Sequence, residues 1–148
     1  HLNKYTSHQK KAQSYLRNIR LNERRIQVLE AEIEMQQSRL TLNGVSGGEN
    51  VSKTLEGDCH EQGFVKLYEL CDTLNTDLIG YVEERNQALK ALANIENANY
   101  YVVLYFVYFN GMRFKELSTL LHVSERQVFN WHARALSILY RYLPVEFR

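Results

Sequence analysis

Two long stretches of the chain carry apolar residues at every seventh position. In the first stretch, from about residue 5 to residue 42, the repeat runs through Tyr5, Ala12, Ile19, Ile26, Ile33 and Leu40. In the second, from about residue 61 to residue 97, it runs through Leu67, Leu74, Tyr81, Ala88 and Ile95. A strict seven-residue repeat is typical of left-handed coiled coils, and so narrow a stripe needs a partner helix. We therefore predict two long helices, which pair with each other as an antiparallel hairpin or with copies in a second subunit.

The segment between these stretches predicts a flexible connection. Residues 43–60 hold four of the seven glycines and show no periodic apolar pattern, which favours a loop. Asn22 falls on the stripe of the first helix. There it either fixes the register of the pairing, as buried asparagines do in coiled coils, or sits at a wet edge, and the sequence leaves both interpretations open.

A run of ten apolar residues, from residue 100 to residue 109, follows the second long stretch. Its tyrosines, valines and phenylalanines have strong strand propensity, and periodicity alone does not separate a buried strand from a buried helix. We predict a helix because nothing else in the chain offers a strand partner. The helix is expected to end at Asn110-Gly111 with the glycine as its C-cap.

The stretch from residue 114 to residue 139 predicts two short helices joined by a tight turn. Leu117, Leu120 and Leu121 have the i, i+3, i+4 spacing of one helix face, and His122-Val123 interrupts that pattern. Ser124 then suits an N-cap, with Gln127 in the N3 position of a capping box. The apolar positions of the second helix follow as Val128, Trp131, Ala135, Leu136 and Leu139. The order is that of a helix-turn-helix, in which the second helix lies in a DNA major groove.

With Val128 and Trp131 packed on the first short helix, the remaining positions of the second helix point outward and carry side chains suited to DNA. Arginine bonds guanine edges, asparagine suits adenine, and phenylalanine contacts a thymine methyl group. The expected base-contacting residues on the helix 124–139 are Glu125, Arg126, Gln127, Phe129 and Asn130. The expected phosphate-contacting residues are Arg113, Lys115, Ser124 and Arg134. His132 is expected to be exposed on the outer half of this helix. A surface hairpin with a solvated face is the alternative interpretation.

The net charge of +1 divides unevenly along the chain. Residues 1–42 carry a net charge of +4, residues 43–99 of −6 and residues 100–148 of +3. A basic C-terminal region suits phosphate contact. The acidic middle is not expected to contact DNA, and its attraction to the basic first helix is the simpler explanation of the pattern.

The sequence lacks the signatures of catalysis, metal binding and membrane insertion. It has no Gly-rich phosphate loop and no CxxC pair, and Cys59-His60 and Cys71 are too sparse for a zinc site. No stretch reaches the ~18 consecutive apolar residues of a membrane span. We expect a non-enzymatic protein without a cofactor or metal, with reduced thiols, in the cytoplasm of a bacterial host.

The segment FKELSTLLHVSERQVFNWHARAL resembles region four of bacterial primary sigma factors. The match rests on Glu116-Leu117, Val123-Ser124, Arg126-Gln127-Val128 and the closing run at 133–136. The whole chain is similar to RinA/ArpU-like late transcriptional regulators of phages and mobile elements. In that family a long helix, a Gly-rich loop and a second long helix precede the module. His122 stands where such modules usually carry glycine, and Phe129-Asn130 replaces the Arg and Gln of sigma factors, so promoter preference is not carried over.

Together these patterns predict an all-α protein with a helical hairpin or coiled coil over 1–97 and a helix-turn-helix domain over 98–148. The expected function is sequence-specific binding of double-stranded DNA in transcriptional regulation, with dimerisation through the long helices. Two alternatives remain open. One is a DNA-packaging component of the small-terminase type. The other is a protein-interaction module that contacts RNA polymerase or a phage or element regulator.

Overall fold

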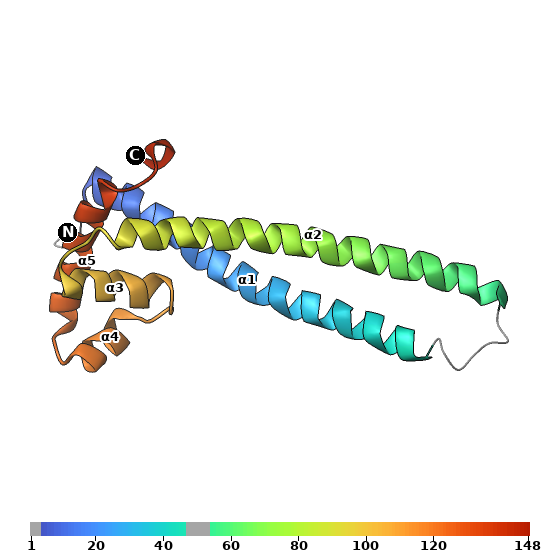
Figure 1. Ribbon diagram of the computed structural model, residues 1–148. Helices are drawn as coiled ribbons and strands as arrows, with labels where there is room; N and C mark the ends of the chain where they lie inside the picture. Colours follow the sequence, from blue (N-terminus) through green and yellow to red (C-terminus); the bar gives the residue numbers. More distant parts are fainter. Residues whose placement is uncertain (1–3, 47–53) are drawn as a thin grey trace. The chain divides into compact units, whose positions relative to one another are not determined.

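The chain is built from helices throughout the part that the structure describes. The computed structural model describes residues 4–46 and 54–148. In order, its helices are α1 (Ser7–Ser46), α2 (Thr54–Leu92), α3 (Ala98–Tyr108), α4 (Phe114–Leu121), α5 (Glu125–Tyr140) and the short 3-10 helix η1 (Val145–Phe147) (Figure 1). The described residues include no strand, and the predicted all-α class is confirmed.

The chain divides into two compact units that do not follow the order of the sequence. Unit 1 comprises His1–Glu23 and Glu83–Arg148, and unit 2 comprises Arg24–Val82. Each unit therefore contains a part of α1 and a part of α2. The boundary that the sequence places between residues 97 and 98 falls inside unit 1, because the first turns of α1 and the last turns of α2 pack with the short helices.

Unit 2 contains the C-terminal part of α1 and the N-terminal part of α2, paired within one chain. Ile26 and Ile33 of the predicted heptad stripe are buried, as is Cys71 on α2. The guanidinium of Arg25 on α1 lies over the ring of Tyr81 on α2, 5.6 Å from its centroid. On α1 the buried isoleucines are positions of the seven-residue repeat, whereas on α2 the repeat positions Leu67, Leu74 and Tyr81 are half-buried and Cys71 lies between them. The repeat therefore marks the side of each helix that faces the seam.

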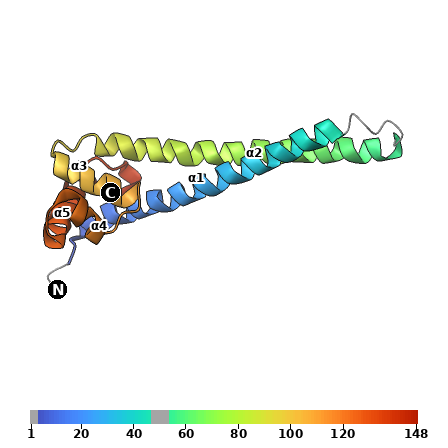
Figure 2. The same cartoon turned by 90° about the horizontal axis from the view of Figure 1, so that it is seen from below.

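Unit 1 has a larger core, which joins the beginning of α1 to the end of α2 and to α5. Its fully buried members include Ala12, Leu16, Ile19, Ala88, Leu92, Leu104, Ala135, Leu136 and Leu139. In both views, α5 and the start of α1 lie side by side (Figures 1 and 2). Because the first turns of α1 meet the last turns of α2, the two helices run antiparallel here, as the hairpin interpretation predicted.

Polar contacts accompany this pairing at the edge of unit 1. Asn22 is 1% exposed, and its Nδ2 donates a hydrogen bond to the Glu84 carboxylate. Beside it, Nε of Arg85 forms an ion pair with Oε1 of Glu23 at 2.5 Å. Asn22 therefore lies in the buried seam and not at a wet edge. Because its amide is buried, it needs a hydrogen-bond partner, which Glu84 on α2 provides. Such a pair ties one position of α1 to one position of α2 and so favours a single register.

Helices occupy both ends of the segment 43–60, which the sequence predicted to be a loop. Helix α1 continues to Ser46 and α2 begins at Thr54, while residues 47–53 lie outside the described residues. The prediction was wrong at both ends because the absence of an apolar pattern does not end a helix. Once a helix has formed, each added residue adds a hydrogen bond, so its ends extend beyond the packed stripe.

Helix α3 confirms that the aromatic run is helical. It starts at a cap that the sequence analysis did not identify, where Oδ1 of Asn97 accepts from the amides of Asn99 and Tyr100 at 2.9 and 3.3 Å. The helix ends with Phe109, and not Gly111, as its C-cap. Gly111 instead forms the turn that follows, with φ +70°, a conformation that glycine adopts without strain.

Candidate functional site

Helices α4 and α5 meet at a short turn whose local chemistry matches the sequence prediction. Oγ of Ser124 accepts a hydrogen bond from the amide of Gln127 at 3.0 Å, which confirms the predicted N-cap of α5. Helix α4 ends at His122, which has φ 55° and ψ 43°. This left-handed conformation explains why glycine suits the position, and His122 adopts it at some strain.

A small apolar core holds α3, α4 and α5 together. Val103, Leu117 and Val128 are fully buried there, one from each helix. Trp131 packs against this cluster, as the sequence predicted. Leu120 is 49% exposed, so its predicted place in the buried face was wrong. Helix α4 has only eight residues, and only Leu117 of its face is fully buried against α3 and α5. Leu120 lies beyond the edge of that buried face.

The structure brings the predicted DNA-contacting residues together on the α4–α5 part of unit 1 with different degrees of exposure. The exposed ones are Arg113, Lys115, Ser124, Glu125, Arg126 and Arg134. The half-buried ones are Gln127, Phe129 and Asn130. Nε of Arg113 lies 3.5 Å from Oε1 of Glu116 in an exposed ion pair. Exposed pairs of this kind are weak, so Arg113 remains accessible to a competing anion.

Phe129 is packed more closely than an outward-pointing residue would be. The centroid of its ring lies 5.5 Å from that of Tyr5 and 6.5 Å from that of Phe114. Tyr5 precedes α1, and Phe114 is the first residue of α4. The ring of Phe129 thus joins three segments of unit 1 and presents only part of its surface to solvent.

His132 is buried, and its predicted exposure was wrong. It is 1% exposed, with Nε2 2.8 Å from the hydroxyl of Tyr108 and Nδ1 3.0 Å from the hydroxyl of Tyr5. Burial, and to a smaller extent the nearby charge of Arg17, lower the pKa of His132 to about 4. The imidazole is therefore neutral at physiological pH. One of its nitrogens then donates to a tyrosine and the other accepts from the second tyrosine.

Tyr5, which contacts His132, directly precedes α1, and the first residues of α1 make further contacts along α5. Nε2 of Gln9 donates to the carbonyl of Ala133 and to Oγ of Ser137, both at 2.9 Å. The ring of His8 stacks on Tyr140, with centroids 4.0 Å apart and planes inclined by 6°. The beginning of α1 therefore covers the C-terminal half of α5. The first turn of α5 stays exposed, which is the part that contacts bases in helix-turn-helix complexes.

The start of α1 is itself well defined. The amide of Thr6 donates to Oε1 of Gln9 at 2.8 Å, and the amide of Gln9 donates to Oγ1 of Thr6 at 3.2 Å. This is a reciprocal capping box. The Thr-x-x-Gln spacing was a sequence signal for where α1 begins. No local pattern, however, indicated that this turn would contact α5.

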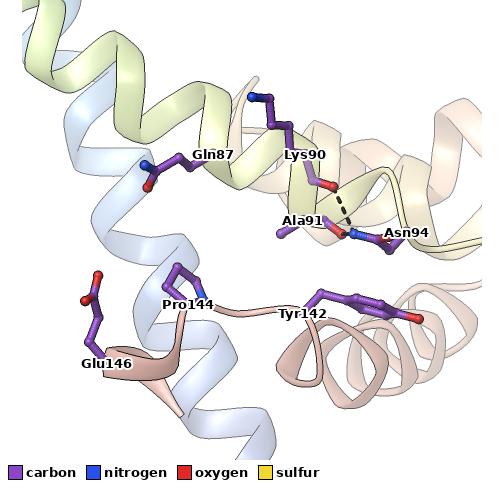
Figure 3. Close-up of a pocket in the computed structure, with 7 residues that line it drawn as sticks. All are labelled: Gln87, Lys90, Ala91, Asn94, Tyr142, Pro144 and Glu146. Atoms are coloured by element: carbon purple, nitrogen blue, oxygen red, sulfur yellow. Dashed lines mark hydrogen bonds between the residues drawn. The ribbon is translucent and has the colours of Figure 1, made fainter.

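An open hollow lies apart from these residues, between the end of α2 and the C-terminal segment. It measures about 400 Å³ and is lined by Gln87, Lys90, Ala91, Asn94, Tyr142, Pro144 and Glu146 (Figure 3). Nδ2 of Asn94 turns back to donate to the carbonyl of Lys90 at 3.1 Å. The hollow shares no residue with the predicted contact set, and its lining does not form a recognisable catalytic group.

The described residues offer neither a metal site nor a membrane-spanning helix. There, no three histidine, cysteine or acidic side chains gather in a way that would hold a metal ion. No helix in the same residues combines the length and apolar character needed to cross a membrane. Comparisons with family models, curated proteins and solved structures found no significant match to this chain.

Proposed function

We propose that this protein binds double-stranded DNA in a sequence-dependent manner, with the first turns of α5 in the major groove. The observation that carries the proposal is the division of α5 into two sides. Val128, His132 and Ala135 are buried, whereas Arg126 and Arg134 are exposed, as is Glu125 at the start of the helix. A short helix held by a small core, with arginines on its outer side, has the form and chemistry of a recognition helix.

The exposed side chains divide into two roles. Glu125, Arg126 and the half-buried Gln127, Phe129 and Asn130 are proposed to contact base edges. Arg113, Lys115, Ser124 and Arg134 are proposed to contact phosphates. Phosphate contacts fix the position of the protein on the duplex, and base contacts decide the sequence. The resemblance to sigma region four and to RinA/ArpU-like regulators supports a role in transcriptional regulation in a phage or mobile element.

Selection of bound duplexes from a random pool tests the proposal directly. The salt dependence of binding should be measured for the selected duplex and for an unselected one. Enrichment of a motif is the expected result, and a spaced inverted repeat would further indicate that two copies bind together. If the unmodified protein binds no duplex even at low salt, the proposed function is wrong.

Two substitutions separate the roles of the contact residues. Arg126→Ala should weaken binding to the selected duplex by about 1–3 kcal/mol and relax its sequence preference. Lys115→Ala should weaken binding to selected and unselected duplexes alike and reduce the salt slope by about one. Lys66→Ala is a suitable control, because Lys66 is exposed on α2 within unit 2. Equal losses on both duplexes for Arg126→Ala and Lys115→Ala would contradict the assignment of roles.

A further inference from the structure

Arg20 of α1 lies against the turn that leads into α4. A Cβ atom added to Gly111 would come within 2.0 Å of Nη2 of Arg20 and 2.5 Å of its Cζ, so the guanidinium rests on the backbone of this turn. Gly111 is close in sequence to Arg113, the N-cap of α4. The positive charge of Arg20 is therefore placed beside the N-terminus of α4, although it comes from a different part of the chain.

Arg17 lies one turn earlier on the same side of α1, since residues three apart on a helix are neighbours. It is exposed, and its charge acts on the buried His132 and on Tyr108 and Tyr5. Tyr5 in turn contacts the ring of Phe129. Arg17 is thus an exposed neighbour of Arg20 along α1, and the two arginines share one side of the helix.

Neither arginine is neutralised within the described part of the chain. No carboxylate there forms an ion pair with Arg17 or Arg20. The nearest acidic residues along α1 and α2 have other partners, because Glu23 pairs with Arg85 and Glu84 accepts from Asn22. Two uncompensated guanidinium groups raise the local positive potential and attract a polyanion.

We propose that Arg17 and Arg20 extend the DNA-contacting surface from α4 and α5 onto α1, where they bind phosphates of the strand that passes the N-terminus of α4. In helix-turn-helix complexes the first helix of the motif crosses the DNA backbone. A phosphate beside the start of α4 then lies close to a side chain that rests on Gly111. This inference rests on the proposed function, and it adds a contribution from a helix outside the helix-turn-helix itself.

The salt dependence of binding measures this contribution. Each phosphate that a cationic side chain neutralises adds about 0.9 to the slope of log affinity against log salt concentration. Arg17→Gln and Arg20→Gln remove the charge and keep most of the aliphatic stem that packs against the protein. On an unselected duplex, each variant should lower the slope by about 0.9 and the double variant by nearly twice that amount.

Matched variants exclude a general effect of charge or folding. Arg39→Gln removes an exposed arginine from α1 nineteen residues beyond Arg20, within unit 2, and should leave the slope unchanged. Arg17→Lys retains the positive charge and should retain the slope. Lys115→Gln should lower the slope through the proposed contact on α4. Circular dichroism of each variant verifies that its helical content matches that of the unmodified protein.

The outcomes separate this inference from the proposed function. If Arg17→Gln and Arg20→Gln keep the full slope while Lys115→Gln lowers it, α1 does not contact DNA and the proposed function stands. Equal reductions from Arg39→Gln and Arg17→Gln would also overturn the inference, because the effect would then follow net charge alone. If the unmodified protein binds no duplex at low salt, both proposals are wrong.

Discussion

His132 should make the stability of the protein depend on pH in the mildly acidic range. It is 1% exposed between the hydroxyls of Tyr5 and Tyr108, and its pKa is lowered to about 4 from the ordinary value of 6.5, first by burial and then by the charge of Arg17. The unfolded chain therefore binds this proton more readily than the folded chain. The stabilisation from neutral His132 is complete above about pH 6.5 and is lost as the pH falls towards 4.

The size of the effect follows from the two pKa values. Each unit of pKa corresponds to about 1.4 kcal/mol, so the difference between 6.5 and about 4 corresponds to about 3 kcal/mol. Solvent screening does not reduce this figure much, because the ring is buried. The geometry gives the cause, since protonation turns both ring nitrogens into donors. The tyrosine that donates to neutral His132 then loses its acceptor.

Urea denaturation followed by circular dichroism, repeated between about pH 7 and pH 4, measures the free energy of unfolding against pH. The unmodified protein should lose about 3 kcal/mol more over this range than His132→Gln, whatever the stability of that variant at neutral pH. His122→Asn removes an exposed imidazole and should keep the slope of the unmodified protein. Identical slopes for the unmodified protein and His132→Gln would refute the argument.

Four further substitutions test the packing and backbone of α4 and its turns by urea denaturation. Leu117→Ala should lower the free energy of unfolding by about 2–5 kcal/mol because Leu117 is fully buried, whereas Leu120→Ala should change it by less than about 0.5 kcal/mol. Gly111→Ala should lower the free energy of unfolding by about 1–2 kcal/mol. The backbone of Gly111 has φ +70°, which strains any residue with a Cβ, and the side chain of Arg20 would also have to move. His122→Gly should raise the free energy of unfolding by about 1 kcal/mol by relieving the strain at φ 55°, and an unchanged or lower value would contradict this account.

Features that depend on neighbouring residues could be predicted from the sequence. Ser124 caps α5 as expected, because an N-cap is made by a hydroxyl and an amide three residues away. Ile26 and Ile33 are buried because a seven-residue repeat places them on one line along a helix. The aromatic run of α3 was correctly assigned to a helix only by considering the rest of the chain, since its own propensity favours a strand.

Features that depend on distant residues could not be predicted. His132 lies four residues from both Val128 and Leu136, so helical spacing places it on the apolar face of α5, a signal that the expectation of exposure overlooked. The spacing does not show, however, that Tyr5 from a distant segment covers the ring. The hydrogen bonds from Gln9 to α5 have no signature in either segment. For the proposed site, the sequence identified which residues of α5 are exposed at its start. It did not reveal that α1 limits the accessible face or places Arg20 beside Gly111.

The composition of unit 1 from both ends of the chain has a consequence for folding. Tyr5 and His132 are 127 residues apart in sequence, and Gln9 and Ala133 are 124 residues apart. Contacts of such high contact order form late, because the entropy of closing a long loop is lost before they contribute stability. During synthesis from the N-terminus, the apolar side of α1 is made long before α5. A nascent chain therefore exposes Leu16 and its neighbours until the last helices appear, and this interval is when aggregation or chaperone binding would compete with folding.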